Sequence, residues 1–352
     1  MSNNICLFFC FTTFFIFQIG LHVTGITIDQ DDLTFRFKDF VTRYNRSYIN
    51  NPAEYRYRMS VFEASLKRQE MLNKREKELK GKAVYGINKF SDWTEEEFVG
   101  HLSKFNNGSL LLDSDLPCCY VVEHEPSLLS WDWRKHSKVT SVKNQGNCGS
   151  CWAFAATGVV ETQWAIEKNL ASPLQLSVQE FVSCSGNAGC LGGSTEKTLE
   201  WLMISRYNST GDKPEKYYLL PASEYPYEEE ESPCSYGHIE PKTGAQIKCA
   251  CYRDFKGKEH FLANYVRTNG SVAVGVNAVL WHDYIGGIIQ HHCTDHVIDH
   301  AVIVEGFDMS GGTPYWIVRN SWGTDFGIDG YLYIKMFENI CGIAEFVSFV
   351  RI

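Results

Sequence analysis

The chain has 352 residues, of which 44% are hydrophobic and 14% aromatic, which is enough apolar material for a sizeable core and excludes global disorder. Its formal net charge of −9 argues against a protein that binds nucleic acid through a basic surface. A chain of this length forms either two modules or one large domain with an appendage.

The N-terminus has the pattern of a secretory signal peptide. Residues 5–19 form an apolar run too short to span a bilayer comfortably, small residues follow at Thr24 and Gly25, and the first charge is Asp29. We therefore predict a signal peptide over residues 1–25. An uncleaved anchor is the alternative, because the first four residues contain no Lys or Arg.

A long charged helix and a short strand come next. Over residues 54–80 the apolar side chains recur at spacings of three and four, which predicts one helix that needs a partner surface. A coiled coil is the other interpretation, and the absence of sustained heptads opposes it. Residues 83–90 have the pattern of a short strand, and residues 101–126 that of a loose connector.

The rest of the chain changes from helix to strand. Helices are predicted from Cys151 to Lys168, after a capping box at Ser177, and from Thr195 to Met203. Beyond residue 270, short β-branched and aromatic runs between glycines predict strands. A helical part followed by a strand-rich part predicts two packed lobes with a cleft where they meet.

Cys151 is the candidate nucleophile. A helix N-terminus and an adjacent imidazolium both lower the pKa of a thiol, and Cys151 stands where the predicted helix begins. His300 leads directly into a β-type run, and Asn320 ends another strand twenty residues later. The residues alone indicate a catalytic cysteine with some histidine, and no more.

Three segments resemble the signature of papain-like cysteine proteases: QGNCGSCWAF at residues 145–154, DHA at 299–301 and NSWG at 320–323. The resemblance implies an α+β papain-like fold with a helical left lobe, a β-barrel-like right lobe and the active-site cleft between them. It also implies a cysteine endopeptidase that cleaves proteins through a thiolate–imidazolium pair and an acyl-enzyme. Residues 286–293 and 313–320 most resemble the cathepsin branch of the family.

The same resemblance implies the roles of individual residues. Cys151 would attack the scissile carbonyl, His300 would hold the thiolate and protonate the leaving amine, and Asn320 would orient the imidazole. Trp322 would shield that hydrogen bond, while Gln145 and the N–H of Cys151 would bind the oxyanion. The residues implied to contact substrate are Gly192, Gly193, Ser194, Thr195, Gly275, Ile298, Ala301 and Phe346. The two glycines would let the substrate backbone pair closely, and the other six residues would line the main specificity pocket. That pocket has no charge, so we expect an apolar or aromatic side chain two residues before the cut.

The N-terminal part resembles the inhibitory prosegment of that family. Four residues fit its long-helix motif (Glu54, Arg58, Phe62 and Asn73), although Ser65 and Gln69 depart from it. Residues 86–92 fit the second prosegment motif. The implied domains are a signal peptide at 1–25, a propeptide at 26–126 and a peptidase domain at 127–352, with a cut near Ser127. Acid should loosen the prosegment, partly by protonating carboxylates such as Asp92.

Thirteen cysteines in a chain bound for the secretory route indicate disulfides. The resemblance implies the pairs Cys148–Cys190, Cys184–Cys234 and Cys293–Cys341. It leaves four cysteines unassigned, which could join the prosegment to the mature chain or cross-link locally: Cys118, Cys119, Cys249 and Cys251. A redox CxxC pair at Cys148 and Cys151 is a weaker interpretation, because no βαβ context surrounds it.

Other sites are less specific. Sequons predict glycosylation at Asn45, Asn107, Asn208 and Asn269. His291, His292, Cys293 and His296 look like a metal cluster, but a disulfide at Cys293 would prevent ligation, so we expect no metal and no cofactor. Asp299 could be mistaken for a triad acid; the resemblance makes it a tuner of pH dependence.

The partners and location follow from the resemblance and the signal peptide. We expect protein substrates, the chain's own propeptide and cystatin-type inhibitors as partners, no nucleic acid, no membrane contact after signal removal, and a monomer in the lysosome or outside the cell. The insert between Met203 and Tyr225 has no cysteine to close a loop over the cleft, which favours an endopeptidase over an exopeptidase. A non-catalytic inhibitor or binding module is the alternative, and the intact motif residues oppose it.

Overall fold

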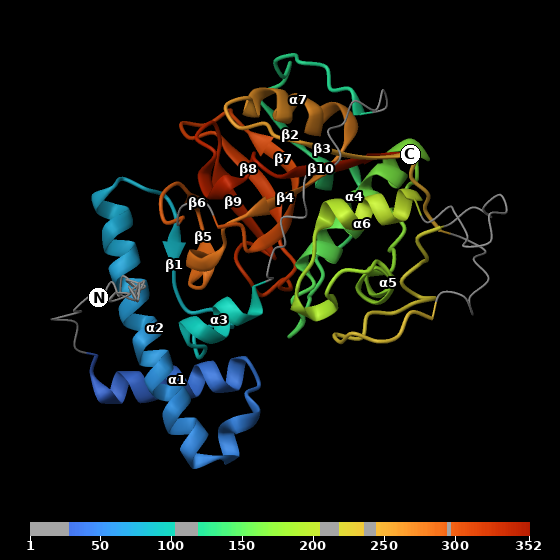
Figure 1. Ribbon diagram of the computed structural model, residues 1–352. Helices are drawn as coiled ribbons and strands as arrows, with labels where there is room; N and C mark the ends of the chain where they lie inside the picture. Colours follow the sequence, from blue (N-terminus) through green and yellow to red (C-terminus); the bar gives the residue numbers. More distant parts are fainter. Residues whose placement is uncertain (1–27, 103–118, 205–217, 236–243, 294–296) are drawn as a thin grey trace, which may run out of the picture.

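The computed structural model describes residues 28–102, 119–204, 218–235, 244–293 and 297–352. These residues form a helical N-terminal arm, a mainly helical lobe and a lobe built on a β-sheet (Figure 1). The arm lies beside the sheet lobe, with its long helix at the left of the view. The α+β class and the two lobes predicted from the sequence are confirmed.

The N-terminal arm consists of two packed helices and the segment that follows them: α1 (Gln30–Arg43), η1 (Ser47–Asn50), α2 (Pro52–Glu78), β1 (Val84–Tyr85) and α3 (Glu95–His101). α2 begins after Asn51, whose side chain accepts hydrogen bonds from two N–H groups of the first turn. Phe37 and Phe40 of α1 pack against Phe62 of α2 in a small core. The predicted long helix is confirmed, and α1 supplies part of the partner surface that it needs.

The strand predicted over residues 83–90 is shorter than expected. β1 spans only Val84–Tyr85, where it pairs antiparallel with β5 (Tyr284–Gly286) of the sheet lobe. The chain then turns at Asn88, whose side chain accepts from Phe90 N at 2.9 Å and donates to His282 O at 2.8 Å. Side-chain contacts therefore replace the ladder after residue 86.

The helical lobe contains α4 (Cys151–Glu167), α5 (Val178–Cys184), η4 (Gly189–Leu191) and α6 (Thr195–Ile204). All three predicted helices are present. Ser177 caps α5 by accepting from Glu180 N at 3.0 Å, but Glu180 itself accepts from Leu220 N at 2.9 Å. The predicted capping box is therefore only half formed, because a neighbouring loop takes the carboxylate.

The sheet lobe contains the remaining described elements: β2 (Ser130–Asp132), η3 (Trp133–His136), β3 (Cys249–Arg253), α7 (Glu259–Asn269), β4 (Val272–Val276), η6 (Val279–Trp281), β5, β6 (Ile288–Ile289), β7 (His300–Asp308), β8 (Tyr315–Arg319), β9 (Tyr331–Lys335), η7 (Ile340–Gly342) and β10 (Val347–Arg351). The strand order is β3-β10-β4-β7-β8-β9-β6, and β2 pairs with β7. Pairing is antiparallel except between β6 and β9. Among the described residues no pairing joins β3 to β6, so the path stays open where a closed barrel would continue.

A buried ionic network joins the two lobes. The guanidinium of Arg319 in β8 lies 2.8 Å from the carboxylate of Glu305 in β7 and donates to Thr140 O at 2.8 Å. Thr140 Oγ1 donates in turn to Glu161 of α4 at 2.5 Å, and Lys143 also bonds to Glu161. Because a carboxylate this deeply buried needs its partners, the network fixes the position of α4 relative to β7 and β8.

We predict that Arg319→Ala destabilises the protein by about 3–5 kcal/mol, because it leaves Glu305 charged and buried without its guanidinium. Urea unfolding of the whole chain measures the change. Lys256→Ala is the matched control, since Lys256 pairs with Glu345 on the surface, and it should leave the unfolding midpoint unchanged. Equal effects of the two substitutions would contradict the role given to the network.

Candidate active site

Cys151 is a buried thiol at the first residue of α4, as the sequence predicted for that helix start. The turn before it is held at several points. The Cys148–Cys190 disulfide closes the turn, Gly149 N donates to Cys190 O at 2.9 Å, and Gln145 N donates to Ser321 O at 2.8 Å. The partial positive charge of a helix N-terminus favours the thiolate over the thiol.

His300 and Asn320 meet because β7 and β8 are antiparallel. Ile303 of β7 lies opposite Arg319 of β8, so the start of one strand adjoins the end of the other. His300 Nε2 lies 2.8 Å from Asn320 Oδ1. An amide oxygen only accepts, so Nε2 carries the proton, and Nδ1 has no hydrogen-bond partner among the described residues.

Trp322 covers this hydrogen bond. Its ring stacks on His300 with centroids 4.7 Å apart, and it is fully buried. Burial and, to a lesser extent, nearby His101 lower the pKa of His300 to about 3, although the bond to Asn320 opposes both. With the N-terminal arm in place the imidazole is therefore neutral at ordinary pH.

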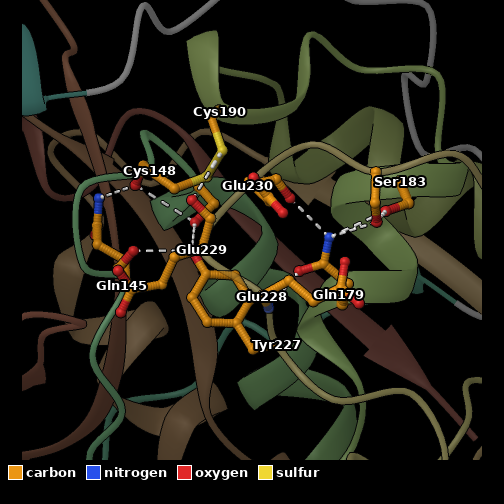
Figure 2. Close-up of a disulfide and its surroundings, with 11 residues drawn as sticks. Gln145, Cys148, Gln179, Ser183, Cys190, Tyr227, Glu228, Glu229 and Glu230 are labelled. Carbon is orange, nitrogen blue, oxygen red and sulfur yellow. Dashed lines mark hydrogen bonds between the residues drawn. A yellow bond between two sulfur atoms is a disulfide. The ribbon is translucent and has the colours of Figure 1, made fainter.

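Gln145 is positioned by two residues that sequence reasoning missed. Its Nε2 donates to Cys148 O at 2.9 Å, and its Oε1 accepts from Ser321 Oγ at 2.7 Å. Tyr227 OH donates to Gln145 O at 2.8 Å and lies 2.6 Å from Ser150 Oγ. Figure 2 shows Tyr227 beside Gln145 and the Cys148–Cys190 disulfide. Tyr227 lies in a distant loop without a motif, so no sequence pattern indicates its role.

The residues expected to contact substrate come from both lobes. Gly275 pairs with Ala301 across β4 and β7, and its N–H donates to Phe346 O at 2.9 Å, so these three lie together. Ser194 and Thr195 lie at the start of α6, and Ile298 precedes β7.

The two glycines before α6 meet different needs. Gly192 has φ of 131°, a backbone conformation that side chains disfavour. A Cβ at Gly193 would lie 2.6 Å from the ring of Trp152, so this position has no room for a side chain.

Two carboxyl groups lie near this region. Burial raises the pKa of Asp299 to about 7, and its oxygens accept from Ala278 N at 2.7 Å and Asn277 Nδ2 at 3.0 Å. These bonds join Asp299 to the chain after β4, while Asn320 bonds the imidazole. Burial and then Glu200 raise the pKa of Glu196, next to Thr195, to about 7, which the sequence did not indicate.

Residues 86–101 of the arm pack against Trp322. The rings of Phe90, Phe98 and His101 lie 5.4, 5.5 and 6.0 Å from it, and Lys89 Nζ donates to Trp322 O. This contact covers one side of the site and removes Trp322 from water.

Farther along, α2 is anchored to the sheet lobe by buried polar contacts. Asp283, which is 1% exposed, accepts from Arg68 Nε at 2.5 Å and Gln69 Nε2 at 2.9 Å. Near the end of the helix, Glu76 Oε1 lies 2.9 Å from His292 Nε2, and both side chains are buried. Gln69 departs from the family motif in the sequence, and here it is an anchor.

The structure contains the three disulfides that the resemblance implied, Cys148–Cys190, Cys184–Cys234 and Cys293–Cys341. A further disulfide joins two cysteines that the sequence left unassigned, Cys119 and Cys251. Cys118 lies outside the described residues, and Cys249 is disulfide-bonded.

Cys293, as half of a disulfide, is unsuited to metal ligation. His296 lies outside the described residues, within which no group of three or more His, Cys, Asp or Glu could hold a metal ion. Of the four sequons, Asn45 is exposed, Asn269 is partly buried beside Arg351, and Asn107 and Asn208 lie outside the described residues. Within the part of the chain that the structure covers, no helix has the length and apolar character to cross a membrane.

Comparisons with known proteins cover almost the whole chain. The family model described as papain family cysteine protease matches residues 128–351, and the cathepsin propeptide inhibitor domain matches residues 37–98. The chain is 41% identical over 296 residues to cathepsin O of Homo sapiens, covering 82% of this chain and 86% of the relative. It is 38% identical over 277 residues to cathepsin O of Mus musculus, covering 76% and 82%.

Solved precursor structures have the same fold. Digestive procathepsin L 3 of Tenebrio molitor larval midgut matches with a TM-score of 0.76 at 28% identity, covering 91% of this chain and 99% of that one. The recombinant stem bromelain precursor matches with a TM-score of 0.75 at 28% identity, covering 92% and 99%.

The structure reverses the sign of the acid effect expected at Asp92. Arg46 and Tyr48 bond its carboxylate at 2.7 and 2.6 Å, but burial is the larger influence and raises its pKa. A carboxyl group whose pKa is raised in the folded protein takes up its proton more readily there than in the unfolded chain, so acid acting there does not destabilise the folded arm. Asp92 is therefore not a group through which acid loosens the arm.

Three histidines with buried side chains at the contact between the arm and the sheet lobe have the required sign. Burial lowers the pKa of His101, His282 and His292 to about 4, whereas an exposed imidazole titrates near about 6.5. Docking is therefore fully favoured above that pH and is weakened, by up to about tenfold per pH unit for each histidine, as the pH falls toward 4.

We predict that His101→Phe moves release of the arm to lower pH, because the aromatic contact with Trp322 stays while one proton site is lost. Tryptophan fluorescence of the intact chain with Cys151→Ala, titrated from pH 7 to 4, measures release without proteolysis. His124→Phe, at an exposed histidine, should leave the curve unchanged. If the fluorescence titration curves of all three proteins superimpose, His101 does not contribute to release of the arm by acid.

Proposed function

The chain belongs to the papain family of cysteine proteases and is made with an inhibitory propeptide, and on this premise we propose that it is a cysteine endopeptidase of the lysosome or the extracellular space. Its substrates are proteins and peptides, as they are for a peptidase with an open cleft. The insert between Met203 and Tyr225 has no cysteine to close a loop over one end of that cleft, which supports cleavage within chains.

The proposed reaction uses Cys151 as the nucleophile. Its thiolate bonds to the scissile carbonyl carbon, and the C–N bond breaks as the imidazolium of His300 gives its proton to the leaving amine. A water molecule, deprotonated by His300, then attacks the thioester and releases the acid. The oxyanion of each tetrahedral intermediate accepts from Gln145 Nε2 and the Cys151 N–H.

One observation carries this proposal: the His300–Asn320 hydrogen bond, 2.8 Å long and buried under Trp322, on a strand that packs against α4. It fixes the ring through Nε2 and leaves Nδ1 for the thiol. The neutral imidazole of the covered form also fits a zymogen, because uncovering His300 restores the charged form that an ion pair with Cys151 needs.

Substrate selection is assigned to residues at the lobe junction. Gly192 and Gly193 would pair with the substrate backbone, since Gly193 has no room for a side chain. The pocket for the residue two places before the cut would be lined by Ser194, Thr195, Gly275, Ile298, Ala301 and Phe346. Apolar side chains fit this lining best.

The proposed processing follows the domain boundaries. Residues 1–25 act as the signal peptide, residues 26–126 as the propeptide, and residues 127–352 as the peptidase domain, which acts as a monomer. Besides its own propeptide, cystatin-type proteins would inhibit it, and the sequons are the sites proposed for glycosylation.

A thiol-directed epoxide tests the assignment of the nucleophile. We expect one covalent adduct on Cys151 after acid activation, found by peptide mass mapping, and none in Cys151→Ser, which should be secreted but inactive. If the activated enzyme cleaves protein and the epoxide does not label Cys151, the proposed mechanism is wrong.

The role of Asn320 is one of positioning. Asn320→Ala should lower kcat/KM by about 10- to 100-fold, less than the loss from His300→Ala, because the imidazole is misplaced but still present. The hydrogen bond raises the pKa of His300, so its loss should also move the alkaline limb of the pH profile to lower pH. An unshifted profile, or losses equal to those of His300→Ala, would show that Asn320 does not orient the ring.

A further inference from the structure

Residues 119–126, here called the strap, lie on the N-terminal side of the expected cut but belong physically to the peptidase domain. Cys119 is completely buried and forms a disulfide with Cys251 of β3, with Cα atoms 5.5 Å apart. β3 is an end strand of the sheet and pairs with β10. Cys119 and Val121 are both part of the core of the sheet lobe.

The strap then runs over α7, as the green segment at the top of Figure 1 shows. Glu123 pairs with Lys258 at 3.6 Å and Glu125 with His260 at 3.5 Å, at the start of that helix. Glu123 and Glu125 are 56% and 75% exposed, and Lys258 is 56% exposed, so these ion pairs contribute little. The disulfide and the burial of Val121 hold the strap.

Residues 28–102, the described part of the prosegment before the strap, have no such bond. Residues 28–102 contain no cysteine, so α1, α2, β1 and α3 are held to the peptidase domain by non-covalent contacts alone once the chain is cut. On the other side of the expected cut, β2 pairs with β7, and Met309 N donates to Leu129 O at 2.6 Å. The chain is therefore bound to the sheet lobe both before and after the expected cut.

We propose that the strap stays covalently attached to the peptidase domain in the active enzyme, through Cys119–Cys251, after the inhibitory part of the prosegment has left. A cut at Ser127 then yields two chains joined by a disulfide, and a cut before Cys119 yields an N-terminal extension. In both cases the active enzyme carries a segment over α7 and the edge of β3, on a different part of the lobe from the one that docks the arm.

The proposal rests on removal of the prosegment but not on the catalytic assignments, so the test uses two routes. The wild-type zymogen is activated at acid pH without reductant, and the Cys151→Ala zymogen is trimmed with pepsin at the same pH. Thiols are alkylated, the fraction containing the peptidase domain is isolated, and its mass and peptides are determined before and after reduction.

We expect the non-reduced fraction from both routes to contain residues 119–126 at one copy per domain and to yield a cross-linked peptide joining Cys119 to Cys251. A strap released only by reductant shows a cut at or near Ser127, and a strap that stays after reduction shows a cut before Cys119. Glu123→Gln with Glu125→Gln is the matched variant, and it should retain the strap because the disulfide is intact.

A non-reduced peptidase domain that starts at or after Ser127, without residues 119–126, would overturn the proposal. So would loss of the strap in the double Gln variant. The wild-type zymogen could fail to process itself while the trimmed variant keeps its strap. That result would contradict the proposed self-activation and would support the covalent attachment of the strap.

Discussion

The hydrogen bond between His300 and Asn320 is stable only where water is excluded, because water would compete for both partners. Residues from several parts of the molecule exclude water from it. Trp322 stacks on the imidazole, and residues Phe90 and Phe98 of the arm cover Trp322 in turn. The strands that bring the pair together are held by the buried Arg319–Glu305 contact directly beside Asn320. The proposed catalytic geometry and the docking of the prosegment therefore depend on the same apolar cluster around Trp322.

This arrangement ties inhibition to charge. The proposed thiolate–imidazolium pair needs a charged ring, and burial in the covered form lowers the pKa of His300 to about 3. The same burial holds His101 and His282 neutral at the arm's own contact with the lobe. Acid acts on the histidines at this contact in the direction of release, so docking of the arm is linked to the charge of its own contact residues.

Much of the fold and the site could be predicted from the sequence, because those features depend on residues that are close together in the chain. The start of α4 at Cys151 and the long helix α2 follow from periodicity, while the meeting of His300 and Asn320 needed a family resemblance. Tyr227 beside Gln145, and α1 as partner of α2, depend on contacts between segments far apart in the chain, which no local pattern encodes. The sign of the effect at Asp92 could not be predicted either, because it depends on burial.

The sequence motifs and the disulfide bonds place the boundary between prosegment and enzyme at different residues. The family resemblance places the boundary near Ser127, from the place where the peptidase pattern begins, whereas the disulfide places residues from Cys119 onward with the sheet. The strap is held by its disulfide to the end strand and by its place in the core of the lobe, and its exposed ion pairs contribute little. A boundary based on what can physically separate lies before Cys119. The described residues of the arm, 28–102, contain no cysteine and are held by non-covalent contacts that can dissociate, whereas the strap is bound by a disulfide.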